Sequence, residues 1–218
     1  MQITVISDVV CPWCFIGKRR LEAALDLYAA AHPGAPAPSV TWKPFQLNPD
    51  LPLEGISRAD YVMQKFGRPS KEIYARVAGE GKTVGIEFAF DSIVRQPKTL
   101  KAHTLVEQAY QSGGEPLQGA VKEALMDAYF LHGADLTDDA VLASIAVKAG
   151  LDQAVAEASL KSIDQLDATR QADEDARQMG VSGVPFFIFN NKVAVSGAHP
   201  PENLLQAMEQ ALAKTAAA

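Results

Sequence analysis

The feature that most constrains the fold is the position of the two cysteines of this 218-residue chain. Residues 3–7 are apolar and β-branched and predict a strand, and a helical pattern runs from Pro12 to about Ala30. Cys11 and Cys14, in the order Cys-Pro-Trp-Cys, therefore stand between a strand and a helix. Pro12 suits the first helical position, where its missing N–H is not needed.

The rest of the chain predicts an α/β fold of thioredoxin type. A second strand over 39–47 completes a β–α–β unit long enough for parallel pairing. A helical block follows, and residues 184–189 and 192–196 then predict a hairpin with a turn at Asn190-Asn191. The predicted helices are 58–66 (closed by Gly67 and Pro69), 71–81, 99–111, 115–131, one capped by Thr137 that ends at Gly150, 152–160, 162–179 and 201–214.

This order of elements is that of a thioredoxin-like fold interrupted by an α-helical insertion domain. We expect residues 1–53 and 165–218 to form the discontinuous thioredoxin-like domain, and residues 54–164 to form the insertion.

Composition excludes several classes of function. The net charge is −6, so the chain does not resemble a nucleic-acid-binding protein or a protein attracted to anionic membranes. No long uncharged apolar run predicts a membrane span. The amino terminus lacks the basic and apolar regions of a signal peptide, so we expect a cytoplasmic protein.

The placement of the two cysteines predicts redox chemistry. A free cysteine has a pKa of about 8.5, and unpaired N–H groups at a helix N-terminus favour its thiolate. We expect Cys11 to be exposed and to be the attacking thiolate, and Cys14, one turn inside, to be the resolving thiol. The alternatives are two inert buried cysteines and a structural zinc half-site. Zinc needs about four ligands, and the four histidines are scattered, so we expect no metal and no cofactor besides the redox-active disulfide itself.

A second candidate element is Gly183-Val184-Pro185, at the start of an apolar strand. Proline inside a strand argues against that strand, and a cis Val184–Pro185 bond at its entrance resolves the conflict. The backbone of Val184 would then lie beside the dithiol and pair with an extended peptide. The alternative is an ordinary trans proline at a strand start.

Several segments resemble one known family. Ser7–Arg20, which reads SDVVCPWCFIGKRR, resembles the active-site segment of the FrnE-like branch of the DsbA family. The resemblance implies a thioredoxin domain interrupted by a helical domain, disulfide oxidoreductase or isomerase activity, and a cis proline at Pro185. Later blocks that resemble the same branch are Phe45–Pro49, Ala102-His103, Gly180–Phe187 and Ser196–Pro201.

Two positions depart from related proteins. Periplasmic DsbA proteins carry a histidine between their cysteines, and Trp13 stands there in this chain, so we expect a less depressed thiol pKa and a less oxidising couple. Thioredoxins have a buried acid in the strand before the motif; here Val5 matches that position and Asp8 is the nearest acid. Asp8 is expected either to cap the turn, the favoured reading, or to assist proton transfer to Cys14.

Several residues are candidates for contacts with a substrate. Trp13, Pro185 and Phe186 are candidates for an apolar platform for unfolded chains, and at least one of Phe186 and Phe187 must belong to the core. His103 is expected either to face the active-site groove or to pack between helices. We expect thiol- or disulfide-containing proteins or peptides as partners, with glutathione as a candidate co-substrate and the oligomeric state open between monomer and homodimer.

Two other functions compete with disulfide exchange. One is a glutathione-dependent transferase or isomerase of the kappa-class type, which usually uses a single serine at the nucleophile position. The other is a redox-independent, chaperone-like binding module. The presence of both sulfurs favours the redox function.

Overall fold

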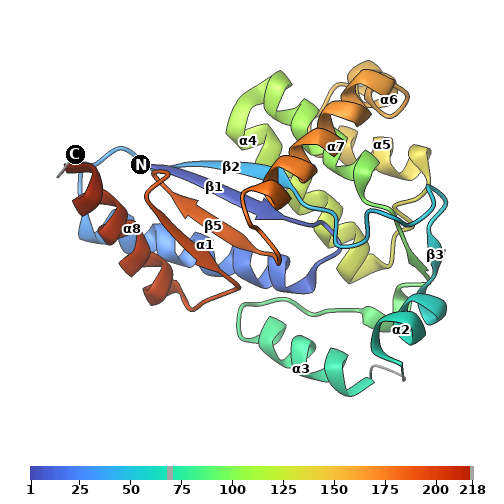
Figure 1. Ribbon diagram of the computed structural model, residues 1–218, viewed down its shortest axis with the longest axis horizontal. Coiled ribbons are helices and arrows are strands. Elements are labelled where there is room, and N and C mark those ends of the chain that lie inside the picture. Colours follow the sequence, from blue (N-terminus) through green and yellow to red (C-terminus); the bar gives the residue numbers. More distant parts are fainter. Residues whose placement is uncertain (68–70, 217–218) are drawn as a thin grey trace.

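A four-stranded sheet forms the centre of the molecule. The structure is a computed structural model that describes residues 1–67 and 71–216. The strand order is β2-β1-β5-β6, with β1 parallel to β2 and antiparallel to β5 (Figure 1). The predicted β–α–β unit and the hairpin are therefore confirmed, and Asn190 and Asn191 both have positive φ in the turn. The strands are β1 (Gln2–Ser7), β2 (Ser39–Pro44), β5 (Phe186–Phe189) and β6 (Val193–Ser196).

The two faces of this sheet are covered by different helices. Ile3, Val5 and Phe187 belong to the main apolar core, which also contains buried residues of α1 and α8. Ile6 and Phe186 point to the other face and pack with Ala176 of α7. Alternate residues of a strand point to opposite faces, which explains this division. The helices are α1 (Pro12–Ala31), α2 (Arg58–Phe66), α3 (Lys71–Lys82), α4 (Leu100–His132), α5 (Asp139–Lys148), α6 (Gln153–Ser159), α7 (Ile163–Gln178) and α8 (Pro201–Ala216).

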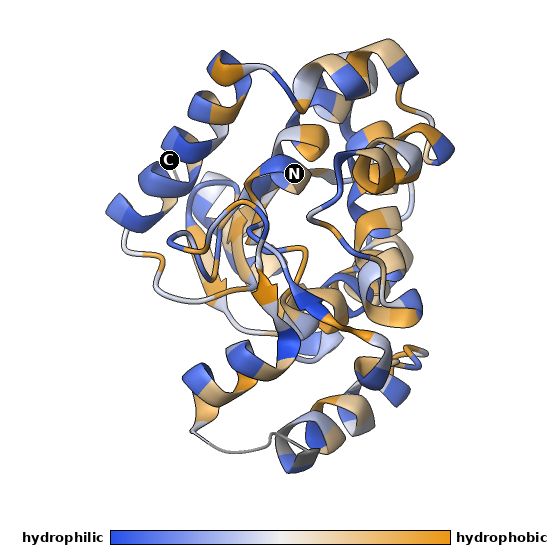
Figure 2. Ribbon diagram, turned by 90° about the vertical axis from the view of Figure 1, so that its right-hand side faces the viewer, coloured by the Kyte–Doolittle hydropathy of each residue, from blue (hydrophilic) through white to orange (hydrophobic). Residues whose placement is uncertain are grey.

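The helical segment is packed against the same core as α1. Phe15 of α1 lies 6.0 Å from Phe130 of α4 and 6.1 Å from Phe88, measured between ring centroids. Figure 2 shows the hydrophobic colour along the central strands, whereas the surrounding helices alternate between the two colours. The predicted domain boundaries stay a prediction, because one continuous apolar cluster joins residues from both parts.

Most helix ends lie where the sequence predicts them. Ser162 caps α7 by accepting from the N–H of Gln165. The two helices predicted over 99–111 and 115–131 form one element, α4, with a kink at Gly113 and Gly114, where Gly114 has φ +67°. That kink explains why the sequence pattern breaks there. The predicted stop at Pro69 and the last residues of the alanine-rich tail, 217–218, lie outside the described residues.

Two local predictions were wrong, and three short elements were not predicted. Thr137 does not cap α5, because Asp138 accepts from two N–H groups of that helix at 2.7 and 3.4 Å. Strand β2 ends at Pro44 rather than Leu47, because side chains of Asp173 and Asp8 bind the N–H groups of Gln46 and Leu47. The sequence analysis also missed a short turn of 3-10 helix and a two-stranded antiparallel sheet. These elements are η1 (Phe90–Ser92), β3 (Ile56–Ser57) and β4 (Arg95–Gln96).

Helix α4 supplies the hydrogen bonds that β2 lacks on its outer side. The side-chain oxygen of Gln118 accepts from the N–H of Trp42 at 2.9 Å, and its amide donates to the Trp42 carbonyl at 3.0 Å. Glu115, three residues earlier, accepts from the N–H of Val40 at 3.2 Å. An unpaired edge strand exposes such groups, so these contacts fix the position of α4 relative to the sheet. Within the residues described, none of the helices is both long and apolar enough to cross a membrane.

Replacing Gln118 with leucine should weaken this attachment. Both backbone groups of Trp42 would lose their partners, and each unpaired buried group costs about 1–3 kcal/mol. We expect the free energy of unfolding to fall by about 2–4 kcal/mol, measured by denaturant unfolding. Gln111→Leu, at an exposed position of the same helix, is the control and should change it by less than about 0.5 kcal/mol. Equal losses in the two variants would contradict this role of Gln118.

Candidate active site

The two cysteines occupy the amino-terminal end of α1. Cys11 is the N-cap residue, with φ −94° and ψ 112°, and Pro12 is the first helical residue. The N–H of Cys14 donates to the carbonyl of Cys11 at 3.0 Å, so Cys14 lies one turn inside. Both thiols are free, and the first turn contains no acidic residue to offset the helix dipole. The local geometry is therefore the one predicted from the Cys-Pro-Trp-Cys segment.

The prediction that Cys11 is exposed is wrong. Cys11 is 5% exposed, and Cys14 is 1% exposed. The Cys11 thiol donates to the carbonyl oxygen of Val184, with Sγ and oxygen 3.6 Å apart. The chain segment around Val184 therefore lies against the sulfur, a contact between residues that are 173 positions apart. Cys11 is still the outer of the two sulfurs.

The Gly183-Val184-Pro185 segment lies beside the dithiol helix. The Val184–Pro185 bond is cis, which confirms that prediction. Gly17, on the second turn of α1, faces Pro185 so closely that a Cβ atom there would lie 2.8 Å from the proline Cγ. The same Cβ would lie 3.3 Å from Cζ of Phe187. Only glycine leaves room for this approach of α1 to the start of β5.

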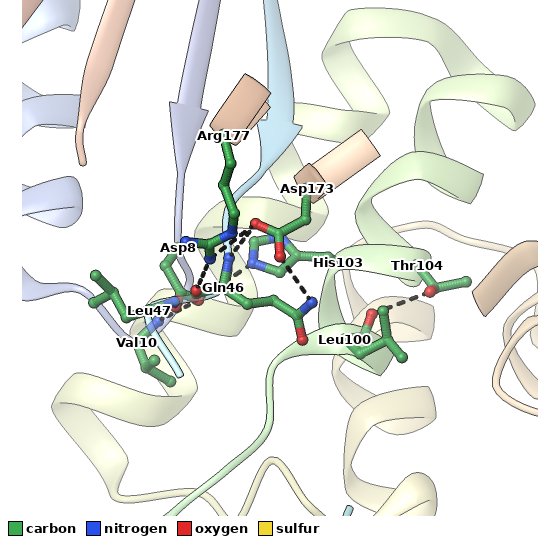
Figure 3. Close-up of polar contacts among 9 residues, drawn as sticks. All are labelled: Asp8, Val10, Gln46, Leu47, Leu100, His103, Thr104, Asp173 and Arg177. Carbon is green, nitrogen blue, oxygen red and sulfur yellow. Dashed lines mark hydrogen bonds and ion pairs between the residues drawn. The ribbon is translucent and has the colours of Figure 1, made fainter. Parts of the chain in front are cut away.

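Asp8 and His103 form a buried pair behind the dithiol. His103 Nε2 lies 3.2 Å from Asp8 Oδ1, and the side chains are 2% and 0% exposed (Figure 3). The other carboxylate oxygen of Asp8 accepts from the N–H of Leu47 at 2.8 Å, and its backbone carbonyl accepts from the N–H of Cys11 at 3.3 Å. Asp8 does more than cap its turn, because it also binds the segment after β2 and helix α4. His103 faces this carboxylate.

A second polar group holds the segment after β2 in place. Asp173 of α7 accepts from the backbone N–H of Gln46 at 2.9 Å and from its side-chain amide at 3.2 Å (Figure 3). Arg177, one turn later, donates to the Gln46 carbonyl and lies 4.1 Å from the ring centroid of Phe45. Helix α7 therefore fixes the residues that also bind Asp8.

The two thiols have opposite pKa shifts. The hydrogen bond from Cys14 lowers the pKa of Cys11 below its ordinary value, although burial and the charge of Asp8 act to raise it. Burial raises the pKa of Cys14 well above its ordinary value, and the hydrogen bond and charge of Cys11 raise it further. Cys11 is therefore the sulfur that ionises first, as predicted, and Cys14 keeps its proton.

The pair behind them is a carboxylate and a neutral imidazole at neutral pH. Burial raises the pKa of Asp8, but the interactions with His103, the hydrogen bond from the N–H of Leu47 and the charge of Lys122 together outweigh it, and the pKa lies below its ordinary value. Burial lowers the pKa of His103, and the hydrogen bond to Asp8 only partly offsets this. Because an ionised carboxylate only accepts hydrogen bonds, the proton of the neutral ring sits on Nε2.

The comparisons with known proteins agree with this geometry. A family model described as the DSBA-like thioredoxin domain matches residues 2–209. The chain belongs to this DsbA-like family. It is a family of thiol–disulfide oxidoreductases, so the predicted fold and family are confirmed, while the FrnE-like branch stays a prediction.

Individual relatives of this DsbA-like chain cover almost its whole length. The crystal structure of a probable DsbA oxidoreductase from Streptomyces coelicolor has a TM-score of 0.86 and 29% identity, covering 98% of this chain and 90% of the other. The Bacillus subtilis (strain 168) protein YwbO is 27% identical over 201 residues, 88% of each chain. The cytosolic disulfide reductase DsbM from Pseudomonas aeruginosa shares the fold at 17% identity, with a TM-score of 0.65 and coverage of 100% and 98%.

The remaining predicted residues of the DsbA-like site lie in two places. Pro12 and Trp13 are half-buried in the first turn of α1, next to both cysteines. Phe187 is fully buried in the core, as one of the two phenylalanines had to be. Phe186 is half-buried and packs with Ile6 and Phe45 on the sheet face that α7 covers. The structure thus brings Val184, Pro185 and His103 to the dithiol region, and Phe186 to the other face of the sheet.

Sequence reasoning missed Asp173 and Lys122. Lys122 of α4 is 1% exposed, and its charge is near enough to both cysteines to act on them. One signal was available: Lys122 falls on the helical stripe of Gln118, Leu125 and Tyr129, all of them buried. A lysine in such a stripe is rarely buried without a partner of opposite charge. Across residues 1–67 and 71–216, no group of three or more His, Cys, Asp or Glu side chains is arranged to hold a metal ion.

Replacing Gly17 with alanine should destabilise the DsbA-like domain. Alanine in place of helical glycine normally adds about 1 kcal/mol of stability, whereas overpacking costs about 1–3 kcal/mol. The contact with Pro185 makes the second effect larger, so we expect the free energy of unfolding to fall by about 1–2 kcal/mol. Gly119→Ala, in α4 with no heavy atom within 4 Å of the new Cβ, is the control and should be neutral or stabilising. A stabilised Gly17→Ala variant would show that α1 and β5 are less tightly packed.

Replacing Asp8 with asparagine should lower the pKa of Cys11. The negative charge of Asp8 raises that pKa, and asparagine removes the charge while keeping an oxygen for the N–H of Leu47. The pH dependence of Cys11 alkylation measures the change. Asp26→Asn, at an exposed position of α1, is the control and should leave the profile in place. An unshifted profile in Asp8→Asn would mean that this carboxylate does not act on the thiol.

Proposed function

We propose that this protein catalyses disulfide exchange in protein or peptide substrates, with Cys11 as the attacking sulfur and Cys14 as the resolving sulfur. The observation that carries the proposal is the asymmetry of the two thiols in one helical turn: the pKa of Cys11 is lowered and that of Cys14 is raised. The thiolate is the reactive form of a cysteine. Cys11 therefore ionises more easily and attacks the substrate, whereas Cys14 stays protonated until the resolving step.

In the reducing direction, the reaction consists of two exchanges. The Cys11 thiolate attacks one sulfur of a substrate disulfide, a bond forms between them, and the other substrate sulfur leaves as a thiolate. Cys14 then loses its proton and attacks Sγ of Cys11, which forms the Cys11–Cys14 disulfide and releases the second substrate sulfur. Two electrons and two protons pass to the substrate, and the reverse sequence oxidises a substrate dithiol.

The Val184 carbonyl supports a role for its segment in holding the substrate. It lies 3.6 Å from the Cys11 sulfur, so we expect a chain joined to that sulfur to pass along the backbone at Val184 and Pro185. Main-chain pairing with an extended peptide would tolerate many sequences. Because Cys11 is buried, a substrate sulfur reaches it only after the thiol leaves the Val184 carbonyl. Trp13, which is half-buried in the same turn, is the other residue that we expect to contact a substrate.

Glutathione is the candidate small co-substrate. The disulfide reductase DsbM, a structural neighbour with 15% identity and a TM-score of 0.57 in this form, has been solved with GSH. A dithiol that is reduced by glutathione would act as a reductase or isomerase, whereas one that glutathione cannot keep reduced would act as an oxidant. Equilibration of the Cys11–Cys14 couple with a glutathione buffer decides between these directions.

Single cysteine variants test the proposal. Cys14→Ser should accumulate a mixed disulfide between Cys11 and a substrate such as insulin, because the resolving sulfur is missing. Cys11→Ser should form no such adduct through the buried Cys14 and should lose insulin reduction. Non-reducing electrophoresis and mass spectrometry identify the adduct, and the two variants control for each other because each removes one sulfur from the same turn.

The competing functions predict different results in the same experiment. Undiminished turnover of a glutathione adduct by Cys11→Ser would favour a transferase or isomerase of the kappa-class type. Suppression of aggregation that persists in the double cysteine variant, without disulfide exchange in the wild type, would favour a chaperone-like binding module.

A further inference from the structure

Helix α4 buries a lysine beneath the dithiol. Lys122 is 1% exposed, and its Nζ atom lies 5.7 Å from the ring centroid of Trp42 in β2. Gln118, one helical turn earlier, holds the backbone of the same Trp42 through two hydrogen bonds. Residues four apart share one face of a helix. The clamp at Gln118 therefore fixes the direction in which Lys122 points, towards β2 and the dithiol end of the sheet.

The titratable groups that interact with Lys122 come from several parts of the fold. Cys11 is the N-cap of α1, Cys14 and Lys18 belong to α1, Asp8 lies in the turn after β1, and His103 lies in the first part of α4. The thiolate charge of Cys14 acts on Lys122 more strongly than that of Asp8 or Cys11. Lys18 already pairs with Glu22 and Glu123, at 2.5 and 2.6 Å. In the described part of the chain, no carboxylate lies within ion-pair distance of Lys122.

Such a lysine is costly for stability. Burial lowers the pKa of Lys122 to about 8, and the negative charges nearby offset only part of this effect. The unfolded chain, with an ordinary lysine pKa, binds this proton more tightly than the folded chain, so the cost is fully present below pH 8 and is relieved as the pH rises from about 8 to the ordinary value. A methionine of similar length would fill the same space without this cost.

We propose that Lys122 is a positioning residue for the resolving step, whose ammonium group holds the Cys14 thiolate as that sulfur attacks Cys11. The inference rests on the proposed function, because it assigns a role within the same exchange. Cys14 is buried and protonated at rest, and it must become an anion once in each catalytic cycle. Lys122 and Cys14 are both buried, at 1% exposure each, and the charge of Lys122 acts on the Cys14 sulfur, so this cation would stabilise the anion where water does not reach it.

The chemistry of the step is balanced without further reactants. The proton of Cys14 leaves, the Cys14–Cys11 bond forms, the bond between Cys11 and the substrate breaks, and the substrate sulfur departs with the electron pair and takes up the proton. Lys122 remains protonated throughout. The charge of Asp8 raises the pKa of Cys11, whereas the charge of Lys122 lowers the pKa of Cys14. The two charged groups therefore act on different sulfurs of the dithiol and in opposite directions.

Lys122→Met, Lys122→Arg and Lys101→Met test the proposal. Methionine removes the charge, arginine keeps it, and Lys101, paired with Asp139 at 2.7 Å on the outside of α4, is the matched control. The first readout is the rate at which a preformed Cys11–glutathione mixed disulfide releases glutathione. We expect Lys122→Met to slow this release about tenfold or more at neutral pH, since each unit of thiol pKa changes the thiolate fraction tenfold. Lys122→Arg should recover much of the rate, and Lys101→Met should match the wild type.

A second readout reports the electrostatic contact itself. The titration of the Cys14 side chain by NMR, in a Cys11→Ser background, should move to higher pH in Lys122→Met and return towards the wild-type position in Lys122→Arg. A structural role for Lys122 would not produce this pattern. Wild-type release together with an unmoved Cys14 titration would overturn the proposal.

A third measurement needs no substitution at Lys122, so it holds even if Lys122→Met does not fold. The Lys122 side chain, followed by NMR, should titrate at higher pH in Cys11→Ser, where Cys14 is the remaining thiol, than in the form that also carries Cys14→Ser and has no thiol to ionise. Equal titration in both forms would also overturn the proposal. A different result would show that the proposed function itself is wrong. In that case the wild type would form neither the Cys11–Cys14 disulfide nor a mixed disulfide at Cys11.

Discussion

The buried carboxylate of Asp8 is the contact on which the arrangement of the site depends. It accepts the N–H of Leu47 at 2.8 Å and lies 3.2 Å from Nε2 of His103, while its own backbone carbonyl binds the N–H of Cys11. A buried carboxylate is tolerated only when its oxygens have partners. Three segments, the start of α1, the residues after β2 and the first part of α4, are therefore held in one relative position, and that position sets where the dithiol lies.

Helix α4 is the part of the predicted insertion that contributes side chains near the dithiol. Its first part supplies His103, and its second part, after the kink at Gly113 and Gly114, supplies Gln118 and Lys122. Gln118 attaches the helix to the edge of the sheet. This attachment holds the helix that supplies His103 and Lys122 in a fixed position relative to the strands. The helical segment is thus more than a cover over the thioredoxin-like part, because it brings partners for Asp8 and a cation close to both thiols.

The sequence predicts features that depend on neighbouring residues well, and features that depend on contacts between distant residues poorly. The strand before Cys11, the helix after it, the cap at Ser162 and the turn at Asn190 follow from neighbouring residues, and all of them are present. The end of β2 and the burial of Cys11 were predicted incorrectly, because side chains of Asp8 and Asp173 and the carbonyl of Val184 decide them from far along the chain. The roles of Trp13 and Phe186 stay predictions.

The sequence by itself determined that two thiols occupy one helical turn at the start of a helix and that a Val-Pro step opens a later strand, and it placed the chain in its family. Only the tertiary structure decided which charges surround those thiols. Asp8 meets His103 across 95 positions, Cys11 meets Val184 across 173, and Lys122 reaches the dithiol from a different part of the fold. Helix and turn propensities act over a few residues, whereas desolvation and Coulomb interactions depend on distances in space, which the order of residues does not contain.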